Sequence, residues 1–219
     1  FQNFKKKIIY ITVEDMPGGK NPWIREGFQR NCISRGIKQA SDDDLIIISD
    51  LDEIPNPKLI LNFNSSMKYA VFKQKHFYYK INLHSQKNPF WLGSRICVKK
   101  YLKSPQWLRE LKFKKRPFWR LDKLRLNNIL ESGGWHFCNL KNAEELLYKY
   151  RNLCETNDSF IFNESIDQKY LDLESIKKKI SSGEDIIGRN DSFKKIRIDN
   201  SFPKYILKNI PLYKDWIAN

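Results

Sequence analysis

Two aspartates of this sequence, Asp50 and Asp52, are well placed to bind a metal ion. They are separated by one residue, and Glu53 follows them. Two carboxylates with this spacing can converge on one divalent cation, and oxygen ligands of this kind suit Mg²⁺ or Mn²⁺. Such a cation in turn binds a diphosphate group. Asp-x-Asp pairs are common in surface loops, so the pair alone is weak evidence for a metal site. The evidence is stronger if the neighbouring strands and helices place the two carboxylates at a binding site.

The acidic cluster follows directly on Leu45 to Ser49, an apolar, β-branched run that predicts a buried strand. A similar run, Lys7 to Val13, predicts an earlier strand, and the pair Asn21-Pro22 predicts a helix that starts there and extends to about Gln39. A strand, a helix and a strand in this order predict a right-handed crossover and therefore a parallel pair. In open α/β sheets the ligand lies at the carboxyl ends of such strands, where the acidic cluster stands.

The rest of the chain predicts a mixed α/β sheet flanked by helices, with a helical C-terminal part. No internal repeat or low-complexity linker interrupts it, so residues 1–219 are predicted to form a single domain. The predicted extended segments are 69–83, 90–98, 126–130 and 135–140. The predicted helices are a short one ending at 63, two at 143–154 and 173–181, and a last one that follows 201–203 and ends at 217.

Composition indicates a folded protein whose high positive charge fits either a solvated, lysine-rich surface or an anionic partner. Of the 219 residues 41% are hydrophobic, and the formal net charge is +15. A charge of this size fits nucleic acid, an anionic membrane surface or a phosphorylated donor. Basic residues are densest from Lys99 to Arg125, where interleaved aromatic residues suit single-stranded nucleic acid and a membrane surface equally.

Two further features of the sequence limit the class of protein. No apolar run approaches the roughly 20 residues that a membrane-spanning helix needs. The four cysteines are widely spaced and form no Cys-x-x-Cys pair, which favours buried free thiols over a zinc site or a disulfide framework. They are Cys32, Cys97, Cys138 and Cys154.

His136 is the histidine whose surroundings favour a functional role. It follows Gly133-Gly134, and paired glycines indicate that another part of the chain approaches the backbone closely. In an extended segment, Trp135 and Phe137 point to the face opposite His136. We therefore expect His136 to face the acidic cluster and to offer a third protein ligand to its cation. The alternative is a core histidine bonded to the backbone.

Four blocks of the sequence, taken together, resemble glycosyltransferase family 17, the group that contains the β-1,4-mannosyl-glycoprotein β-1,4-N-acetylglucosaminyltransferase. The blocks follow the order of the family and cover nearly the whole chain. They are Asn21-Pro22-Trp23-x-Arg25-Glu26-x-Phe28-Gln29-Arg30-Asn31, the run from Asp44 to Pro55, Gly133-Gly134-Trp135-His136-Phe137, and Ser201-Phe202-Pro203-Lys204-Tyr205.

This resemblance implies a GT-A-like, Rossmann-like fold, a UDP-N-acetylglucosamine donor, a glycan acceptor, a divalent metal (Mn²⁺ or Mg²⁺) and inversion at the anomeric carbon with a β-1,4 linkage. By matching positions it makes Asp50 and Asp52 the metal and nucleotide carboxylates, and His136 a candidate metal ligand. The candidate donor-side residues are Arg25, Glu26, Arg30 and Asn31.

The chain departs from the family pattern in two places. Family members begin with a further strand and helix that contact the nucleotide base, and this chain is expected to lack that segment. In the stretch from Arg151 to Glu155 the family tends to have a histidine two residues before the glutamate, where this chain has Leu153.

An inverting transferase needs a general base that takes the proton of the acceptor hydroxyl. The candidates are Glu155, which matches an acidic position of the family, and Glu53, which lies nearer the expected metal but can instead hold the loop. Further donor-binding candidates are Arg95, Arg109 and Arg189 for the diphosphate, with Trp91 and Trp135 for a sugar ring. The alternatives are structural: surface or salt-bridged arginines, and aromatic rings buried in the core.

Other functions remain open at this point. A nucleic-acid-binding protein would use the basic stretch from Lys99 to Arg125, and an inactive transferase-like module would only bind glycans. A haloacid-dehalogenase phosphatase also carries Asp-x-Asp after a strand, but Ile54 stands where that chemistry needs a small hydroxyl residue. If the protein is a glycosyltransferase, its expected partners are a UDP-sugar donor, an oligosaccharide acceptor and, by peripheral contact, an anionic membrane surface. Nucleic acid is not an expected partner.

Overall fold

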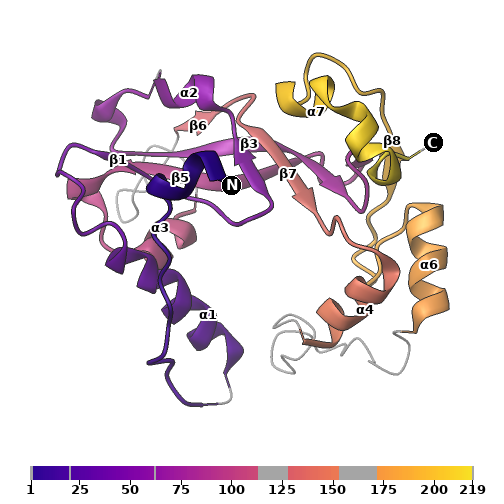
Figure 1. Cartoon of the computed structure of the whole chain (residues 1–219), viewed down its shortest axis with the longest axis horizontal. Helices are drawn as coiled ribbons and strands as arrows, with labels where there is room; N and C mark the ends of the chain where they lie inside the picture. Colours follow the sequence, from indigo (N-terminus) through magenta and orange to yellow (C-terminus); the bar gives the residue numbers. More distant parts are fainter. Residues whose placement is uncertain (1, 20, 62, 113–127, 153–171, 219) are drawn as a thin grey trace, which may run out of the picture. The chain divides into compact units, whose positions relative to one another are not determined.

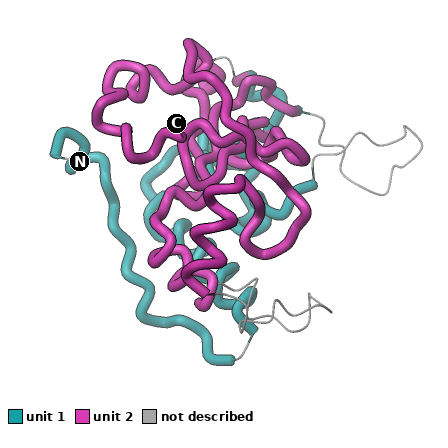
Figure 2. The backbone as a smooth tube through the Cα atoms, turned by 90° about the vertical axis from the view of Figure 1, so that its right-hand side faces the viewer, with its two compact units in different colours: residues 1–48, 64–70, 95–128 teal, residues 49–63, 71–94, 129–219 magenta. Residues whose placement is uncertain are grey.

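The computed structural model describes residues 2–19, 21–61, 63–112, 128–152 and 172–218. The chain divides into two compact units, each assembled from separate stretches (Figure 2). The first comprises residues 1–48, 64–70 and 95–128, and the second comprises 49–63, 71–94 and 129–219. The single domain predicted from the sequence stays a prediction.

The first unit joins a short strand pair to two helices. Helix α1 begins as predicted, because the Asn21 side chain accepts the Trp23 N–H at 2.9 Å and Pro22 occupies the first turn. It ends at Asn31, earlier than expected, and a 3₁₀ turn follows. The apolar faces pack around Ile46, Ile48, Cys97 and Leu108. The elements are η1 (Gln2–Lys7), α1 (Pro22–Asn31), η2 (Cys32–Arg35), β1 (Leu45–Ile48), η3 (Ser65–Met67), η4 (Lys99–Tyr101) and α3 (Pro105–Glu110), with the end of β5 (Phe90–Val98).

The predicted parallel crossover is wrong. Residues 8–18 form no strand, and Ile8, Ile9 and Tyr10 are 52%, 65% and 86% exposed. Strand β1 instead pairs antiparallel with β5, with Leu45 opposite Val98. An apolar, β-branched run favours an extended backbone, but a strand also needs a hydrogen-bonding neighbour, which the local pattern cannot supply. The Rossmann-like parallel core implied by the resemblance is therefore not confirmed.

The second unit is built on β3, which pairs in parallel with β6 and β7 and antiparallel with β4. Strand β7 also pairs antiparallel with β2, and β4 with β8. The strands follow the order β1-β5-β3-β4-β8, with β2, β6 and β7 off this path. Because the sheet contains both parallel and antiparallel pairs and is accompanied by helices, the mixed α/β class predicted from the sequence is confirmed. The strands are β2 (Glu53–Pro55), β3 (Tyr69–Tyr78), β4 (Leu83–Ser85), β6 (Ile129–Leu130), β7 (Gly134–Cys138) and β8 (Phe193–Lys195).

Helices α4 and α6 of the second unit lie side by side and bury Leu146, Tyr150 and Ile176 (Figure 1). Helix α4 starts with a capping box, in which Asn142 accepts the Glu145 N–H and the Glu145 carboxylate accepts the Asn142 N–H. The last predicted helix is broken into α7 and a 3₁₀ segment. No helix of the described part of the chain is long and apolar enough to cross a membrane. The helices are α2 (Pro57–Leu61), α4 (Ala143–Asn152), α6 (Leu173–Ser182), α7 (Lys204–Lys208) and η6 (Ile210–Trp216).

Candidate active site

The acidic cluster forms a tight turn that leads into β2. The Glu53 N–H donates to the Asp50 carbonyl at 3.1 Å, and the Phe137 N–H donates to the Asp52 carbonyl at 2.9 Å. Leu51, at the tip, is fully exposed. The turn therefore presents Asp50 and Asp52, both partly exposed, while β7 holds its backbone.

The Glu53 side chain anchors this turn from the buried side. Its Oε1 accepts the Trp91 indole N–H at 2.9 Å, and its Oε2 accepts the Ser94 hydroxyl and the Asp50 main-chain N–H, both at 3.2 Å. The residue is 5% exposed. A carboxylate with three donors is strongly held in place. These contacts support the interpretation that Glu53 orients the loop, and they give no support to Glu53 as the general base.

The paired glycines at the start of β7, Gly133 just before it and Gly134 as its first residue, are required by close backbone approaches on both sides. A Cβ at Gly133 would collide with the backbone at Phe72 and Lys73, and one at Gly134 would collide with the Ile54 carbonyl oxygen. Gly134 also has φ +121°, which side chains rarely adopt. The close approach that the sequence predicted at this pair is confirmed, and its partners are β3 and β2.

We expect Gly134→Ala to lower the free energy of unfolding by about 2 kcal/mol or more, because it adds backbone strain to a steric collision. Chemical denaturation measures this change. Gly18→Ala is the matched control, since no atom lies within 4 Å of a Cβ there, and its unfolding free energy should stay within about 0.5 kcal/mol of the native value. Equal stability of the two variants would contradict the close approach.

His136 lies beside Asp52, as its place in β7 predicts. Trp135 and Phe137 pack with Phe77 in an apolar cluster on the other face of the strand. The His136 Nε2 atom lies 3.4 Å from the Asp52 Oδ1 atom, and His136 is 7% exposed. The expected position of His136, within reach of a cation that also touches Asp52, is confirmed.

The charges of Asp52 and His136 stabilise each other. Burial disfavours the imidazolium, but the interactions with Asp52 and with Cys138 together outweigh it and raise the pKa of His136 to about 9. Burial also opposes the Asp52 carboxylate, yet His136 and the Lys149 charge together hold the pKa of Asp52 below its usual value. Without a bound cation the two side chains form an ion pair at neutral pH.

A second histidine, His76, supports the His136 ring. The two rings are stacked with centroids 4.8 Å apart and planes 3° apart, and the Trp91 ring lies 5.2 Å from His136. Burial and the charge on His136 lower the pKa of His76 to about 4, so His76 is neutral. Its Nδ1 donates to the Asn88 carbonyl at 3.1 Å. His76 is therefore a positioning residue that fixes the plane of His136.

Asp52, His136 and Cys138 form a compact set of potential metal ligands, whose ligand atoms all lie within 4.8 Å of one another. Metal–ligand bonds of about 2.0–2.3 Å place neighbouring ligands roughly 3 to 3.7 Å apart. The 3.4 Å between Asp52 and His136 fits this range. These residues therefore fit a divalent ion that accepts oxygen, nitrogen and sulfur ligands. Asp50, the other predicted carboxylate, is not one of the three.

A pocket of about 470 Å³ opens beside Asp52, a size within the range of small-molecule sites. Its charged lining residues are Asp52, Lys141 and Lys149. The Lys149 ammonium donates to the Asn139 side-chain oxygen at 2.7 Å. The remaining lining residues are Leu51, Ile54, Phe137, Asn139 and Leu140.

Comparison with models of protein families matches residues 1–195 to glycosyltransferase family 17. The chain belongs to glycosyltransferase family 17. This confirms the resemblance to the family and implies a sugar donor and a glycan acceptor. The matched residues contain the first three sequence blocks, and the fourth, Ser201 to Tyr205, lies beyond them. No curated protein and no solved structure matches the chain.

Three donor-side residues expected from the resemblance to family 17 make contacts within the first unit. Arg30 pairs with Glu26 at 2.8 Å and also donates to the Gln106 side chain of α3. The Asn31 side chain accepts the Gln106 main-chain N–H at 2.9 Å. These contacts join α1 to α3, and the donor-binding role of the three residues stays a prediction.

The remaining residues predicted to bind the donor or to act as the base are spread over several elements of this family 17 chain. Arg25 is exposed on α1, and Arg95 lies in β5 opposite Ile48. The Trp135 indole N–H donates to the Ser201 carbonyl at 2.9 Å, which favours the structural interpretation of this ring. Arg109 lies in α3, and Glu155 lies outside the described residues.

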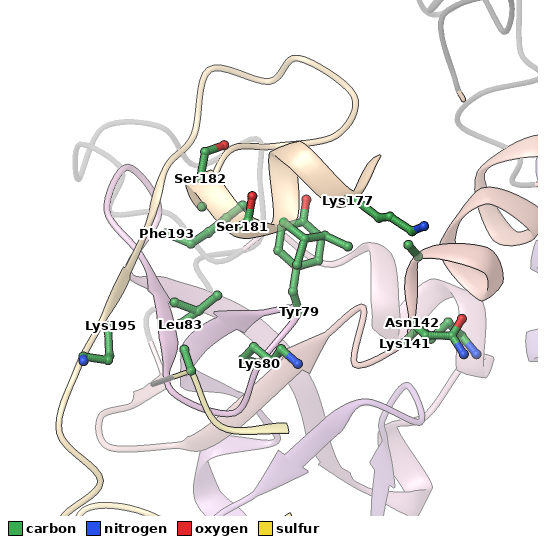
Figure 3. Close-up of a pocket in the computed structure, with 14 residues that line it drawn as sticks. Tyr79, Lys80, Leu83, Lys141, Asn142, Lys177, Ser181, Ser182, Phe193 and Lys195 are labelled. Atoms are coloured by element: carbon green, nitrogen blue, oxygen red, sulfur yellow. The ribbon is translucent and has the colours of Figure 1, made fainter. Parts of the chain in front are cut away.

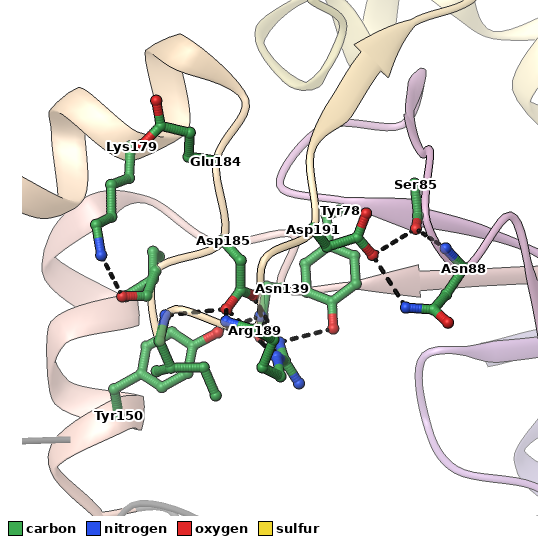
Figure 4. Close-up of polar contacts among 12 residues, drawn as sticks. Tyr78, Ser85, Asn88, Asn139, Tyr150, Lys179, Glu184, Asp185, Arg189 and Asp191 are labelled. Atoms are coloured by element: carbon green, nitrogen blue, oxygen red, sulfur yellow. Dashed lines mark hydrogen bonds and ion pairs between the residues drawn. The ribbon is translucent and has the colours of Figure 1, made fainter. Parts of the chain in front are cut away.

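Arg189 is held by a buried carboxylate of its own segment. The guanidinium contacts Asp185 at 2.8 Å and donates to the Tyr78 hydroxyl at 2.9 Å (Figure 4). The Asp185 side chain is 2% exposed and also accepts the main-chain N–H groups of Ile187 and Arg189. These contacts tie the segment after α6 to β3, so they favour a structural role for Arg189 over diphosphate binding.

A second pocket, of about 560 Å³, lies between the start of α4 and the end of α6 (Figure 3). Tyr79, Leu83 and Phe193 supply apolar walls, and Lys141 lines both this pocket and the one beside Asp52. The other lysines that line it are Lys80, Lys177 and Lys195.

Three residues of the candidate site were not predicted from the sequence: His76, Cys138 and Lys149. Cys138 follows His136 by two residues in a strand, so both face the same side, and this spacing could have signalled a shared ligand set. His76 and Lys149 carry no such signal, because only the pairing of β3 with β7 and the docking of α4 bring them to the site.

Proposed function

We propose that this chain is a metal-dependent, inverting glycosyltransferase that transfers N-acetylglucosamine from UDP-N-acetylglucosamine to a hydroxyl group of a glycan acceptor, with a β-1,4 linkage. Family membership supports transfer of a sugar, and the resemblance noted above supports this donor and linkage. The observation that carries the metal site is the Asp52–His136 pair, 3.4 Å apart beside a pocket of ligand size.

Asp52 and His136, with Cys138, would hold the cation. A divalent ion bound there would neutralise negative charge on the departing UDP diphosphate. Magnesium prefers ligand sets made entirely of oxygen, whereas imidazole and thiolate suit transition metals. A site with one nitrogen and one sulfur ligand therefore disfavours Mg²⁺, and of the two ions that the resemblance implies it leaves Mn²⁺.

The surrounding residues would hold this site ready before the donor binds. Glu53 fixes the turn that carries Asp50 and Asp52, and His76 fixes the plane of the His136 ring. Transfer forms a bond between the acceptor oxygen and the anomeric carbon, breaks the bond from that carbon to the diphosphate, and passes the acceptor proton to a base. Glu155 remains the predicted base.

We expect UDP to bind at least about tenfold more tightly with Mn²⁺ than with EDTA, and more tightly with Mn²⁺ than with Mg²⁺, because a cation held by Asp52 and His136 would attract the diphosphate. Isothermal titration calorimetry on the full chain measures both ratios. Cys138→Ser should narrow the preference for Mn²⁺, since it replaces the soft ligand with a hydroxyl. UDP affinity that is the same with Mn²⁺ and with EDTA would contradict the metal site.

Turnover of a panel of UDP-sugars tests the donor. Release of UDP should be fastest from UDP-N-acetylglucosamine when Mn²⁺ is present. Metal-dependent UDP binding without turnover of any donor would instead support the inactive, glycan-binding module. A faster reaction with another UDP-sugar would overturn the donor assignment and leave the metal site intact.

A further inference from the structure

We propose that Lys149, assisted by Lys141, binds the donor diphosphate in the pocket beside Asp52. This inference rests on the proposed function and names the residues of the chain that hold the leaving group. Both lysines line this pocket, together with Asp52. None of the arginines considered from the sequence lines it.

The ammonium of Lys149 is held in a fixed position. Asn139, which follows β7 and adopts φ +57°, accepts the Lys149 ammonium through its Oδ1 atom at 2.7 Å. The Nδ2 atom of the same side chain donates to the Tyr150 hydroxyl at 2.7 Å (Figure 4). Tyr150 is 1% exposed in the core between α4 and α6. Because Asn139 is locked by a buried residue, the Lys149 charge is fixed before any ligand arrives.

The charges around the pocket favour an anion. Among the described residues that line the pocket, Asp52 is the one acidic side chain, and its carboxylate already faces His136 at 3.4 Å. Lys141 and Lys149 therefore leave the pocket positively charged. An ammonium is a compact point charge that binds phosphate, and it retains two further N–H donors when one contacts Asn139.

A diphosphate is the anion that the proposed reaction would bring to this pocket. When the bond between the anomeric carbon and the diphosphate oxygen breaks, the electron pair stays on the diphosphate, and its negative charge grows. A cation already fixed nearby stabilises that charge without reorganisation. Lys149 thus acts on the leaving group from α4, whereas Asp52 and His136, from the loop before β2 and from β7, would contribute by holding the cation. Arg189 cannot replace it while Asp185 and Tyr78 hold its guanidinium.

The test compares UDP with uridine as calorimetric probes, on the full chain with Mn²⁺ present. Lys149→Met should weaken UDP binding roughly 10- to 100-fold, because a charged hydrogen bond to the diphosphate is lost. Uridine binding should change less than twofold, since uridine has no phosphate. Lys149→Arg should restore part of the UDP affinity. Lys141→Met, at an exposed position, should weaken UDP binding by a smaller factor, about threefold.

Lys178→Met is the matched control, because Lys178 is exposed on α6 and lines none of the pockets described, yet its loss changes the net charge equally. It should leave UDP affinity unchanged. Unchanged UDP binding in Lys149→Met, or an equal loss of uridine and UDP binding, would overturn the role of Lys149 while the proposed function stands. If the native protein itself bound no UDP with Mn²⁺, the proposed function would fall, and this inference with it. Should Lys149→Met not fold, Lys149→Arg and Lys141→Met decide the matter through the same two probes.

Discussion

Asp52→Asn is expected to reduce sugar transfer by roughly 10³-fold or more, because it removes the charged ligand that faces both His136 and the pocket. The amide keeps the shape of the carboxylate and can still accept a hydrogen bond from His136. The side chain of Asp52 is 36% exposed, so the fold should survive the change, with a melting temperature within a few degrees of the native value. Steady-state turnover with Mn²⁺, measured beside thermal unfolding, gives both quantities.

The matched control for this variant is Asp42→Asn. Asp42 is an exposed carboxylate in the turn before β1, and its contact with Lys99 at 4.0 Å is long and exposed to solvent. Its replacement removes the same charge and should leave turnover within about twofold of the native rate. If Asp52→Asn also kept a native rate and a native dependence on Mn²⁺, Asp52 would not be a metal ligand.

Asp185→Ala is expected to lower the free energy of unfolding by about 3 kcal/mol, the largest loss of stability that we anticipate for an acidic side chain of this protein. The Asp185 carboxylate is 2% exposed and accepts the main-chain N–H groups of Ile187 and Arg189 as well as the Arg189 guanidinium. Its loss leaves buried donors without an acceptor. Because Arg189 is 40% exposed and can reach water, the cost should stay below that of a fully buried pair.

Urea-induced unfolding measures this loss, and the melting temperature should fall by roughly 5 to 12 °C for a chain of this size. Asp43→Ala serves as control, since Asp43 makes an exposed ion pair with Lys100, and it should cost at most about 0.5 kcal/mol. The double variant Asp185→Ala, Arg189→Met should lose less stability than the sum of its two parts, because the two residues share one interaction. If the stability loss of the double variant equalled the sum of the two single losses, Asp185 and Arg189 would be energetically independent. Arg189 would then be free for another role, such as donor binding.

Some parts of the fold could be predicted because their signals are local. Asn21 and Pro22 predict the start of α1, because a capping side chain and a proline act within one turn. The run from Leu45 predicts β1, and the aromatic segments predict β3 and β5, because strand preference and burial are written into neighbouring residues. Gly133 and Gly134 predict a close approach because glycine alone tolerates one.

Pairing between strands could not be predicted in this way. The segment from Lys7 to Val13 carries the composition of a strand and forms none, while β1 finds its partner in β5, about fifty residues further along the chain. Direction and order of strands depend on which distant segments meet during folding. That information is spread over the whole chain and is not contained in any single run of residues.

For the site, the sequence by itself determined the chemical types that meet: the carboxylate of Asp52, the imidazole of His136, and the alternation that turns His136 away from Trp135 and Phe137. Only the tertiary structure decided their supports. It placed His76 against His136 through the register of β3 with β7, and Lys149 beside Asp52 through the docking of α4. The physical reason is that spacing along a strand fixes which side chains share a face, whereas contact between separate elements requires the packing of the whole unit.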